Sequence, residues 1–570
     1  MGSENRFVYA PSTVDIGRSK FIMNSFWKGS LYHGYLYPVE ITRVMPGDSA
    51  KYNISAFIRT ATPPISPFMD SIKLSFAAFY VPERLVWNKE KEFLGENTEG
   101  YGIQSEVLAP RSGTAQMTVS VDSAATSYKK SIGTNLGLVR QKVSGITNYS
   151  PIALNPIRCF FSVFNDWFRN ENFMAPYLWD HNQTGDAPRG FATRNGVSIV
   201  AGSDLPRVCK QLDRFTSCLP FAQKGSPVTL GIGGYAPIVT DSVMHGVGVN
   251  DIKFGWYGTG GIISQPSALG IGDNGTLGRL VGFENGTSGS VAVLQPQVGQ
   301  AMEATNLLAD LGSSTATSVN QLRLAFATQK YLEQLARTGS KYREYIKGMF
   351  GVSIGDTTAQ MAEYLGGFTM ELNIDQVLQT TGFAADGTTK LGAPGAVSCS
   401  ANSDYLFTKS FTEPGFIVIV AYTKHNRTYG QGIDDIYFKH EILEEYNPKF
   451  ANVGEEAIKK SLLYFTGDAS DDDTRLGFQE KWSEYRHKKD IVVGELCPSN
   501  TGSLNTWSLA DNYASAPVLN EEFLTEDRSA ITRCLAGGES SPDYFLDIKF
   551  NREFVRPMPL YSIPGLIDHH

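Results

Sequence analysis

Three segments of this chain alternate between polar and apolar residues, a pattern typical of β-strands with one buried face. They cover residues 51–59, 71–81 and 544–554. The apolar face of the first segment holds Tyr52, Ile54, Ala56 and Ile58. A continuous apolar run at 416–422 is typical of a strand that is buried on both faces. These β segments flank a long middle, which favours one β-sandwich with large insertions over two independent domains.

The middle of the chain contains helical patterns. Apolar residues recur every three to four positions in 155–169 and 322–337, which predicts two amphipathic helices. Pro156 suits the first turn of the first helix, and Gly339 ends the second. A shorter helix is expected at 341–350. We expect all three to be packing helices, because an apolar stripe at helical spacing is usually buried in the core.

The segment 225–312 has a different composition, with 19 of the 56 glycines of the chain. A long stretch of this kind inside a compact protein is usually functional or disordered. It still carries scattered large apolar residues, so we expect short strands in an insertion that projects from the body. Its aromatic residues Trp256 and Tyr257 are candidates for contact with a host surface.

Charge and composition exclude several classes of protein. The formal net charge of −8 argues against a surface that binds nucleic acid everywhere, although it leaves room for a local basic patch. The N-terminus has no apolar signal core, and the longest apolar run is too short to span a bilayer. The six cysteines form no CxxC motif, which predicts free buried thiols. We therefore expect a soluble cytoplasmic product without membrane insertion.

No set of residues has the pattern of a catalytic site, and we predict no catalytic residue, no cofactor and no metal site. The sequence Gly270–Gly275 matches GxGxxG formally, but a dinucleotide site needs a helix directly after it. Two alternatives stay open. One is a β-sandwich glycoside-active enzyme, which needs two carboxylates across a cleft. The other is a carbohydrate-binding protein such as a lectin or adhesin, which normally carries an export signal.

One segment mixes cations with aromatic residues in a way that suits single-stranded DNA. Its members are Lys481, Trp482, Tyr485, Arg486, Lys488 and Lys489. Cations neutralise phosphates, and aromatic faces stack on bases without reading their sequence. The alternative is an ordinary half-exposed segment, in which Trp482 and Tyr485 belong to the core and the basic residues are solvated.

The C-terminal tail, residues 556–570, contains three prolines and a glycine, which exclude a long helix or a central strand. It is nevertheless apolar. The residues that need cover are Met558, Leu560, Tyr561, Ile563, Leu566 and Ile567. An extended apolar tail usually lies along its own domain or along a neighbouring subunit.

The tail closely resembles the C-terminus of the major capsid proteins of gokushovirus-type microviruses (Microviridae), small icosahedral bacteriophages with single-stranded DNA. Short sequences in the same order along most of the chain carry the same resemblance. They include PGD at 46–48, FIRTATP at 57–63, FYVP at 79–82, NDWFR at 165–169, LRLAF at 322–326, EYLGG at 363–367, GFQEKW at 477–482 and SLAD at 508–511. The segment 225–312 resembles the family least, as expected for its variable insertion.

The resemblance implies a mainly β protein, an eight-stranded viral jelly-roll β-sandwich with long, partly helical loop insertions. It implies that sixty copies form a T=1 icosahedral shell around a circular single-stranded DNA genome, with the glycine-rich insertion forming surface protrusions at the threefold axes. The implied partners are an internal scaffolding protein, a DNA pilot protein, a small basic packaging protein and a host bacterial surface receptor. The protein would belong to the virion and assemble in the host bacterial cytoplasm.

This interpretation divides the chain into five parts. We expect an N-terminal arm at 1–30, the first jelly-roll strands at 31–90, and inserted loops and helices at 91–400, with the glycine-rich surface protrusion at 225–312. The remaining strands and insertions occupy 401–555, and the extended tail occupies 556–570. In this scheme the tail is an assembly clamp that lies along a neighbour or along the inner shell wall.

Overall fold

The computed structural model describes residues 17–94, 118–120, 129–138, 151–182, 190–228, 319–380, 392 and 394–561, together with short strands between 238 and 309. The chain divides into two compact units. The larger unit combines Met1–Lys224 with Glu333–His570, and the smaller unit is Gly225–Leu332. Each unit is described by itself below.

Two antiparallel sheets form the centre of the larger unit. The first sheet has the order β1-β25-β4-β21, and β2 pairs with β25 beside β1. Its strands are β1 (Ser19–Ile22), β2 (Ser25–Leu31), β4 (Ser49–Thr60), β21 (Ser400–Ser410) and β25 (Tyr544–Arg556). The second sheet has the order β18-β5-β22-β3. Its strands are β3 (Tyr37–Val44), β5 (Ile72–Pro82), β18 (Glu363–Leu372) and β22 (Gly415–His425).

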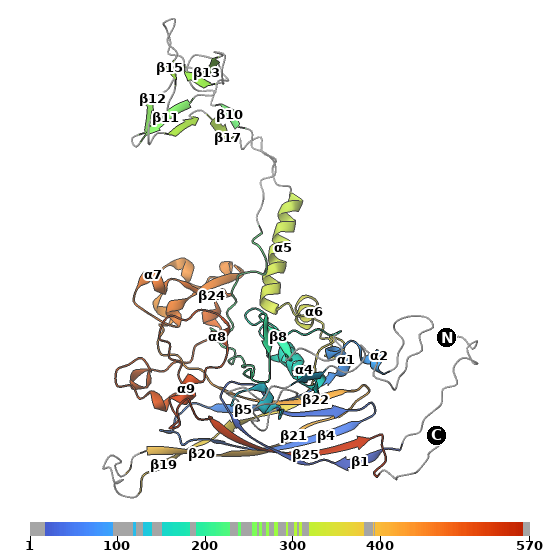
Figure 1. The fold of residues 1–570 in the computed structure, drawn as a ribbon. Coiled ribbons are helices and arrows are strands. Elements are labelled where there is room, and N and C mark those ends of the chain that lie inside the picture. Colours follow the sequence, from blue (N-terminus) through green and yellow to red (C-terminus); the bar gives the residue numbers. More distant parts are fainter. Residues whose placement is uncertain are drawn as a thin grey trace, which may run out of the picture. The chain divides into compact units, whose positions relative to one another are not determined.

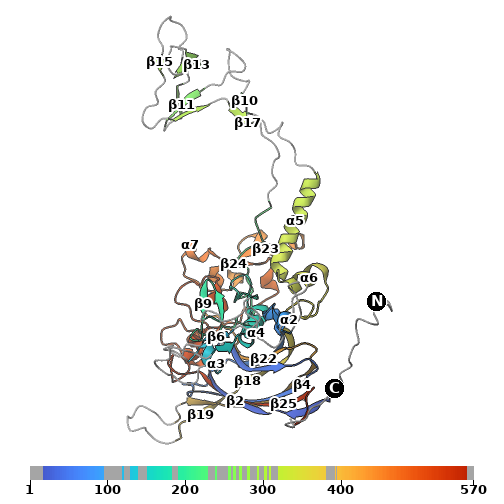
Figure 2. The same cartoon turned by 45° about the vertical axis from the view of Figure 1, so that its right-hand side comes forward.

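The two sheets lie one above the other as two layers (Figure 1, Figure 2). One hydrophobic cluster unites the buried side chains of both sheets, such as Ile54 and Ile548 from the first sheet and Leu74 and Ile417 from the second. The alternation found in the sequence places these residues, because every second side chain of a strand points to the same face. The predicted strands are confirmed at β4, β5, β22 and β25.

The outer side of the second sheet is covered by helix. The main cover is α4 (Asn155–Val163), which contacts β5 and β22 and continues as the π-helix η2 (Phe164–Phe168). Together they confirm the helix predicted at 155–169. Phe160, Phe161 and Phe164 are fully buried. This cover also explains why Phe79, on the second face of β5, is buried although the sequence suggested a strand with a single buried face.

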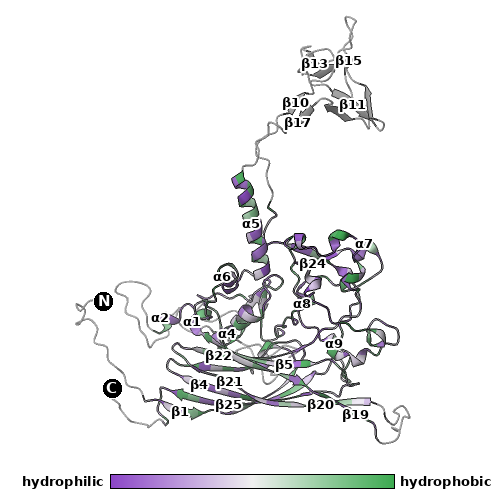
Figure 3. Ribbon diagram, turned by 180° about the vertical axis from the view of Figure 1, so that it is seen from behind, coloured by the Kyte–Doolittle hydropathy of each residue, from purple (hydrophilic) through white to green (hydrophobic). Residues whose placement is uncertain are grey.

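The other predicted helices are present as α5 (Val319–Thr338) and α6 (Tyr342–Phe350), and Gly339 ends α5 with a φ of 89°. The expectation that they pack into the core is wrong. Within α5 only Ala336 is buried, whereas Leu322, Leu324 and Phe326 are exposed. Figure 3 shows hydrophobic and hydrophilic residues mixed along α5. The helical spacing of Leu322 and Phe326 is present, but both side chains are exposed to solvent instead of packed.

The smaller unit contains short antiparallel strands, as expected for 225–312. They form the groups β10-β17, β12-β11-β16 and β13-β14-β15. Their bounds are β10 (Ile238–Thr240), β11 (Phe254–Gly258), β12 (Gly261–Ser264), β13 (Leu269–Gly272), β14 (Arg279–Gly282), β15 (Ala292–Val293), β16 (Ala301–Ala304) and β17 (Leu307–Ala309). The GxGxxG match begins in β13, whose partner β14 follows as a second strand instead of a helix. A dinucleotide site at this position is therefore excluded.

A long insertion joins β22 to β25 and contains short helices and the antiparallel pair β23 (Glu455–Lys459) and β24 (Arg475–Glu480). It contributes to a second hydrophobic cluster that includes Phe215, Leu463 and Phe523. Its other elements are η4 (Asp435–Tyr437), η5 (Ile442–Glu444), η6 (Pro448–Phe450), η7 (Lys460–Leu462), α7 (Ala469–Asp472), η8 (Ser483–Tyr485), η9 (Gly494–Leu496), η10 (Asn505–Trp507), α8 (Glu521–Leu524) and α9 (Ser529–Thr532).

The remaining elements are short and border the two sheets. They are α1 (Glu83–Val86), α2 (Glu90–Phe93), α3 (Ile132–Asn135), β6 (Thr118–Ser120), β7 (Pro151–Ala153), β8 (Ala192–Arg194), β9 (Val197–Ile199), β19 (Ile374–Leu378) and β20 (Pro394–Ser398). All six cysteines are free, as predicted, but the expectation that all are buried is wrong, because Cys399 is exposed and Cys209 is only partly buried. Among the described residues, no helix combines the length and the apolar character needed to cross a membrane.

Candidate functional site

The predicted DNA-binding segment directly follows β24. Its Trp482 has a left-handed backbone conformation, with a φ of 69°. The side chain of Trp482 is only 2% exposed, and its indole Nε1 donates a hydrogen bond of 3.0 Å to the carbonyl of Phe450. The structure therefore places Trp482 in the interior, as the alternative for this segment expected.

Lys489 also has its donors inside the protein. Its Nζ donates to the backbone carbonyls of Gly432, Ile433 and Leu462, at 3.2, 2.9 and 2.9 Å. An ammonium group has three N–H donors, so these three contacts use all of them. Burial lowers the pKa of Lys489. Lys489 therefore links the loop at Gly432 to the end of η7, and its charge does not face solvent freely.

Other cations of the segment lie beside acidic partners. Lys481 Nζ is 3.7 Å from a carboxylate oxygen of Glu456, and Arg486 forms an ion pair with Glu480. Lys488 is exposed and forms no ion pair with any residue that the structure describes. Tyr485, which the alternative for this segment also placed in the core, is instead exposed, and its hydroxyl donates a hydrogen bond of 2.9 Å to Glu445.

A hollow of about 240 Å³ lies beside Tyr485. Its basic residues are Arg214, Lys439, Lys488 and Lys489, and its acidic residues are Asp434, Asp435, Glu445 and Glu484. The four positive charges are therefore balanced by four negative ones, and such a surface attracts phosphates weakly. DNA contact by this segment stays a prediction, and Lys488 is its most available cation.

A second surface combines aromatic rings with cations on the outer face of the first sheet. Phe26 is 68% exposed, and Phe57 and Phe545 are each 40% exposed. The Arg59 guanidinium lies 5.7 Å from the centre of the Phe545 ring, and Lys549 Nζ lies 5.9 Å from that of Phe26. We call these five residues the aromatic-basic face. Helices lie on the side of the second sheet, and no described helix covers this face (Figure 1, Figure 2).

Charge on this side of the first sheet is positive on balance. The acidic residues of β25 are already paired, Asp547 with Lys28 at 3.4 Å and Glu553 with Lys20 at 2.8 Å. Lys51, Arg59 and Lys549 form no ion pair with a described residue.

Sequence reasoning missed the aromatic-basic face. The available signal is an aromatic residue among polar ones on the solvent side of a strand. Phe57 interrupts the polar face of 51–59, and Phe545 shares the polar face of its strand with Asp547 and Lys549.

The start of the C-terminal tail is fixed at the end of β25. Arg556 Nε lies 3.6 Å from an oxygen of Asp48, and its guanidinium lies 4.5 Å from the centre of the Phe554 ring. Beyond Arg556, the structure places three of the predicted tail residues in solvent, namely Met558, Leu560 and Tyr561. Ile563, Leu566 and Ile567 lie outside the described residues, as do the side chains of Trp256 and Tyr257 in β11.

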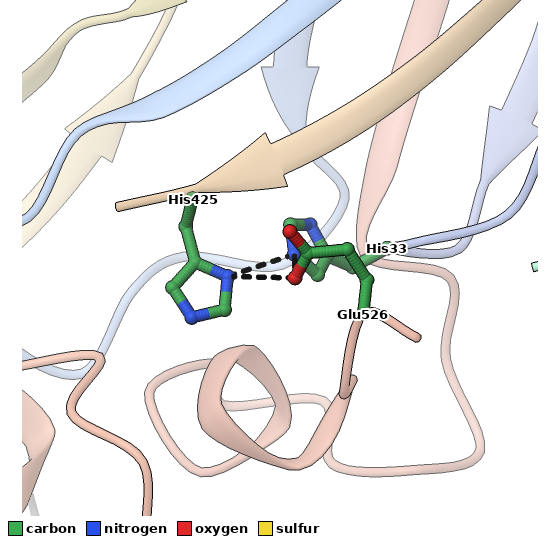
Figure 4. Close-up of side chains that lie close together, drawn as sticks. All are labelled: His33, His425 and Glu526. Atoms are coloured by element: carbon green, nitrogen blue, oxygen red, sulfur yellow. Dashed lines mark hydrogen bonds and ion pairs between the residues drawn. The ribbon is translucent and has the colours of Figure 1, made fainter. Parts of the chain in front are cut away.

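Three titratable side chains meet in the interior of the larger unit (Figure 4). His33 lies between β2 and β3, His425 is the last residue of β22, and Glu526 follows α8. His33 Nε2 is 3.0 Å from His425 Nδ1, and Glu526 Oε2 lies 3.5 and 3.4 Å from these nitrogens. All three side chains are 0% exposed. Although no metal was predicted, these residue types are metal ligands.

A buried ionic network adjoins this cluster. Arg427 forms ion pairs with both Glu526 and Asp511, and Lys210 Nζ lies 3.4 Å from Asp511. Burial alone would raise the pKa of Glu526, but Arg427 and the two histidines together lower it to about 2. Burial and the charge of Arg427 lower the pKa of His425 well below its usual value. Glu526 is therefore ionised and His425 neutral at neutral pH.

Comparison with known proteins identifies relatives along almost the whole chain. A family model described as "Capsid protein (F protein)" matches residues 11–566. The chain is 31% identical over 540 residues to a capsid protein VP1 of Spiroplasma virus 4, covering 94% of this chain and 92% of that protein. It is 30% identical over 602 residues to a capsid protein VP1 of Chlamydia phage 1, covering 99% and 98%. It is 32% identical over 566 residues to a capsid protein VP1 of Bdellovibrio phage phiMH2K, again covering 99% and 98%.

Proposed function

Because this chain belongs to the phage capsid protein (F protein) family, we propose that sixty copies assemble as a T=1 icosahedral shell around a circular single-stranded DNA genome. This chain is the structural major capsid protein of a microvirus and a component of the virion. The match over residues 11–566 carries this conclusion. A closed shell works through many modest symmetric contacts, which allow correction during assembly.

We infer that the two sheets form the eight-stranded viral jelly roll, with β1 and β2 counted as one interrupted strand. The strand orders β2-β25-β4-β21 and β3-β22-β5-β18 support this inference. Counted along the chain from β2, they read 1-8-3-6 and 2-7-4-5. Strands 1 and 8, 2 and 7, 3 and 6, and 4 and 5 are thus neighbours, as in one long hairpin wrapped into two layers. The insertions lie in the connections between strands.

We propose that the aromatic-basic face contacts the enclosed genome. Exposed rings of Phe26, Phe57 and Phe545 offer stacking surfaces that accept any base, and Arg59 and Lys549 offer charge for phosphates. The helical cover on the second sheet leaves the first sheet as the open side of the two layers (Figure 1). The 481–489 segment is the second candidate, and the balanced charges of its hollow make it the weaker one.

The double variant Arg59→Glu/Lys549→Glu tests this proposal. We expect shells to form but to contain less DNA, measured as the ratio of full to empty particles in sedimentation. Binding of the unassembled chain to oligo-dT should lose about 0.7 units of salt-dependence slope for each contacting cation removed. Lys449→Glu is a control for charge reversal at an exposed lysine that lies in η6, outside both sheets. Normal packaging by the double variant would refute the proposal, and a loss only in Lys488→Glu would move the contact to the 481–489 segment.

We propose that the smaller unit forms the protrusion at the threefold axes and that Trp256 and Tyr257 contact the host receptor. The compactness of Gly225–Leu332 as a separate unit supports its role as an inserted module. The same family assignment underlies our proposal that the scaffolding, DNA pilot and small basic packaging proteins are partners, and that assembly takes place in the host cytoplasm.

We propose that the tail 556–570 acts as an assembly clamp. Three apolar side chains of the described tail, Met558, Leu560 and Tyr561, are exposed in the single chain. Exposed apolar side chains in sequence need cover from elsewhere, and a neighbouring subunit provides it in a closed shell.

A further inference from the structure

We propose that His33, His425 and Glu526 form a buried binding site for one divalent metal ion of the zinc class. The three side chains come from separate parts of the larger unit and point toward one common centre (Figure 4). Imidazole nitrogens and a carboxylate oxygen are ligands that zinc takes in proteins. The metal site goes beyond the proposed shell-forming role and does not rest on it.

The spacing of the three ligand atoms fits a tetrahedral ion. Zinc binds histidine nitrogen and carboxylate oxygen at about 2.0–2.1 Å, so two ligand atoms at tetrahedral corners lie about 3.3 Å apart. The observed separations are 3.0 Å between the two nitrogens, and 3.4 and 3.5 Å between each nitrogen and Glu526 Oε2. The three ligand atoms can therefore reach one ion with small movements, and a water molecule would occupy the fourth corner.

Hydrogen bonds alone do not satisfy this triangle of atoms. If both histidines point an N–H at the ionised Glu526, two donors face each other across 3.0 Å. If one histidine accepts a hydrogen bond from the other, the accepting nitrogen carries no hydrogen. Its lone pair then faces the carboxylate oxygen of Glu526, which is repulsive. Every arrangement of protons thus leaves one of the three contacts unfavourable, and burial makes this costly. A cation at the centre removes the conflict, because all three atoms then contribute lone pairs.

The surroundings orient the ligands. The Tyr544 hydroxyl lies 3.3 Å from His33 Nδ1, the ring nitrogen that faces away from the centre, as expected for an outer partner of a metal-bound histidine. Arg427 contacts Glu526 Oε2, the same oxygen that would bind the ion, and thereby fixes its position, while Asp511 offsets the charge of Arg427. Lys210 adds a further positive charge beside Asp511, at 3.4 Å.

Such an ion would connect segments that are distant in the sequence. His33 and His425 are 392 residues apart. Through them, the turn between β2 and β3 and the end of β22 would be joined to the insertion that carries Glu526. A metal ion bound only by the folded chain stabilises the folded state, so it would hold this insertion against the sheets.

The first experiment uses the full chain, expressed with zinc and dialysed against metal-free buffer. Elemental analysis should give about one tightly held zinc ion per chain. Prolonged EDTA treatment of the unassembled chain should lower the thermal midpoint by several degrees, and Zn²⁺ should restore it. Co²⁺ should restore it too and produce the intense visible absorption of a four-coordinate cobalt site. A chain without stoichiometric zinc, whose midpoint does not respond to EDTA or to added zinc, would overturn the proposal.

Variants separate this site from adventitious binding. His33→Gln and Glu526→Gln should each lose the tightly held zinc and the cobalt absorption, whereas His181→Gln, at a half-buried histidine elsewhere, should keep both. All are made with His569→Ala/His570→Ala, because a terminal histidine pair can bind zinc by itself. Zinc retained in both ligand variants would refute the assignment. If these variants do not fold, the metal content and cobalt spectrum of the otherwise unchanged chain still decide the question.

Discussion

Replacing Lys489 by methionine should destabilise the subunit, whereas the same change at its neighbour Lys488 should not. The sequence gives both residues the same status, as adjacent cations of a possible DNA contact. In the structure, Lys489 Nζ donates to three backbone carbonyls, and Lys488 is exposed. The two variants therefore test whether the segment is mainly structural.

The magnitude follows from the contacts that are lost. Each hydrogen bond contributes about 1 kcal/mol net, and carbonyls left without a donor in the interior cost at least as much. Loss of the contacts to Gly432, Ile433 and Leu462 therefore lowers the free energy of unfolding by about 3 kcal/mol in Lys489→Met. Lys488→Met should change it by no more than about 0.5 kcal/mol, as is usual for exposed positions.

Urea denaturation of unassembled subunits, followed by tryptophan fluorescence, measures both values. The slope with urea should be equal in the two variants, so the midpoints report stability directly. Equal midpoints for Lys489→Met and the parent chain would refute the structural role of Lys489. If Lys489→Met folds normally but its particles lose DNA, Lys489 is a genome contact instead.

Three further predictions concern other regions. The pKa of Asp511 is about 2, because Arg427 and Lys210 outweigh the opposing effect of burial. The ionised carboxylate therefore stabilises the fold at pH values above 3.8, its pKa in the unfolded chain. As the pH falls toward 2, the free energy of unfolding should decrease by about 2 kcal/mol. Thermal midpoints measured against pH should show this loss in the parent chain and a flatter profile in Asp511→Asn. Truncation after Pro557 keeps Arg556 at its contacts, so it should impair shell formation in electron micrographs while leaving subunit stability unchanged; equal loss of both would place the tail in its own subunit's core. Deletion of 240–295 should permit assembly but reduce adsorption to host cells, and normal adsorption would contradict the receptor role.

Alternation in the sequence predicts the strands that have a polar and an apolar face. Tyr52, Ile54 and Ile58 are buried in β4, as expected. In β25 the corresponding residues Leu546, Ile548 and Phe550 are buried too. In these strands local chemistry and the final fold agree, because a period of two can bury only one face. The same reasoning did not exclude a carbohydrate-active β-sandwich protein, since a strand pattern says nothing about function. The match to the capsid protein family distinguishes between the two.

Strand β18 shows where alternation is insufficient. Its register shifts between Tyr364 and Gly366, which breaks the period of two. A Cβ at Gly366 would lie 2.3 Å from the carbonyl oxygen of Leu406, and one at Gly367 would lie 2.3 Å from that of Phe76. Both glycines are therefore needed for close approach of neighbouring strands. This requirement comes from the tertiary structure and has no local signal.

The candidate sites were predictable only in part. The 481–489 segment is visible because its cations and aromatics are adjacent in sequence, but the carbonyls that hold Lys489 belong to loops up to 57 residues away. The cluster of His33, His425 and Glu526 could not be predicted from the sequence, because its members are far apart along the chain. Each is an isolated polar residue, and only the strand order brings the three together.

The strand order also has a consequence for biosynthesis. β25 lies between β4 and the β1–β2 edge, yet it is made after every other strand that the structure describes. The first sheet therefore cannot close during translation. Strand β4 can pair with β21 earlier, but its other neighbour follows nearly five hundred residues later, since Asn53 pairs with Asn551. Such long-range pairing is slow, and the waiting strands are exposed to aggregation meanwhile. A chain that stops before β25 lacks the strand that joins β4 to β1 and β2, so its first sheet stays incomplete.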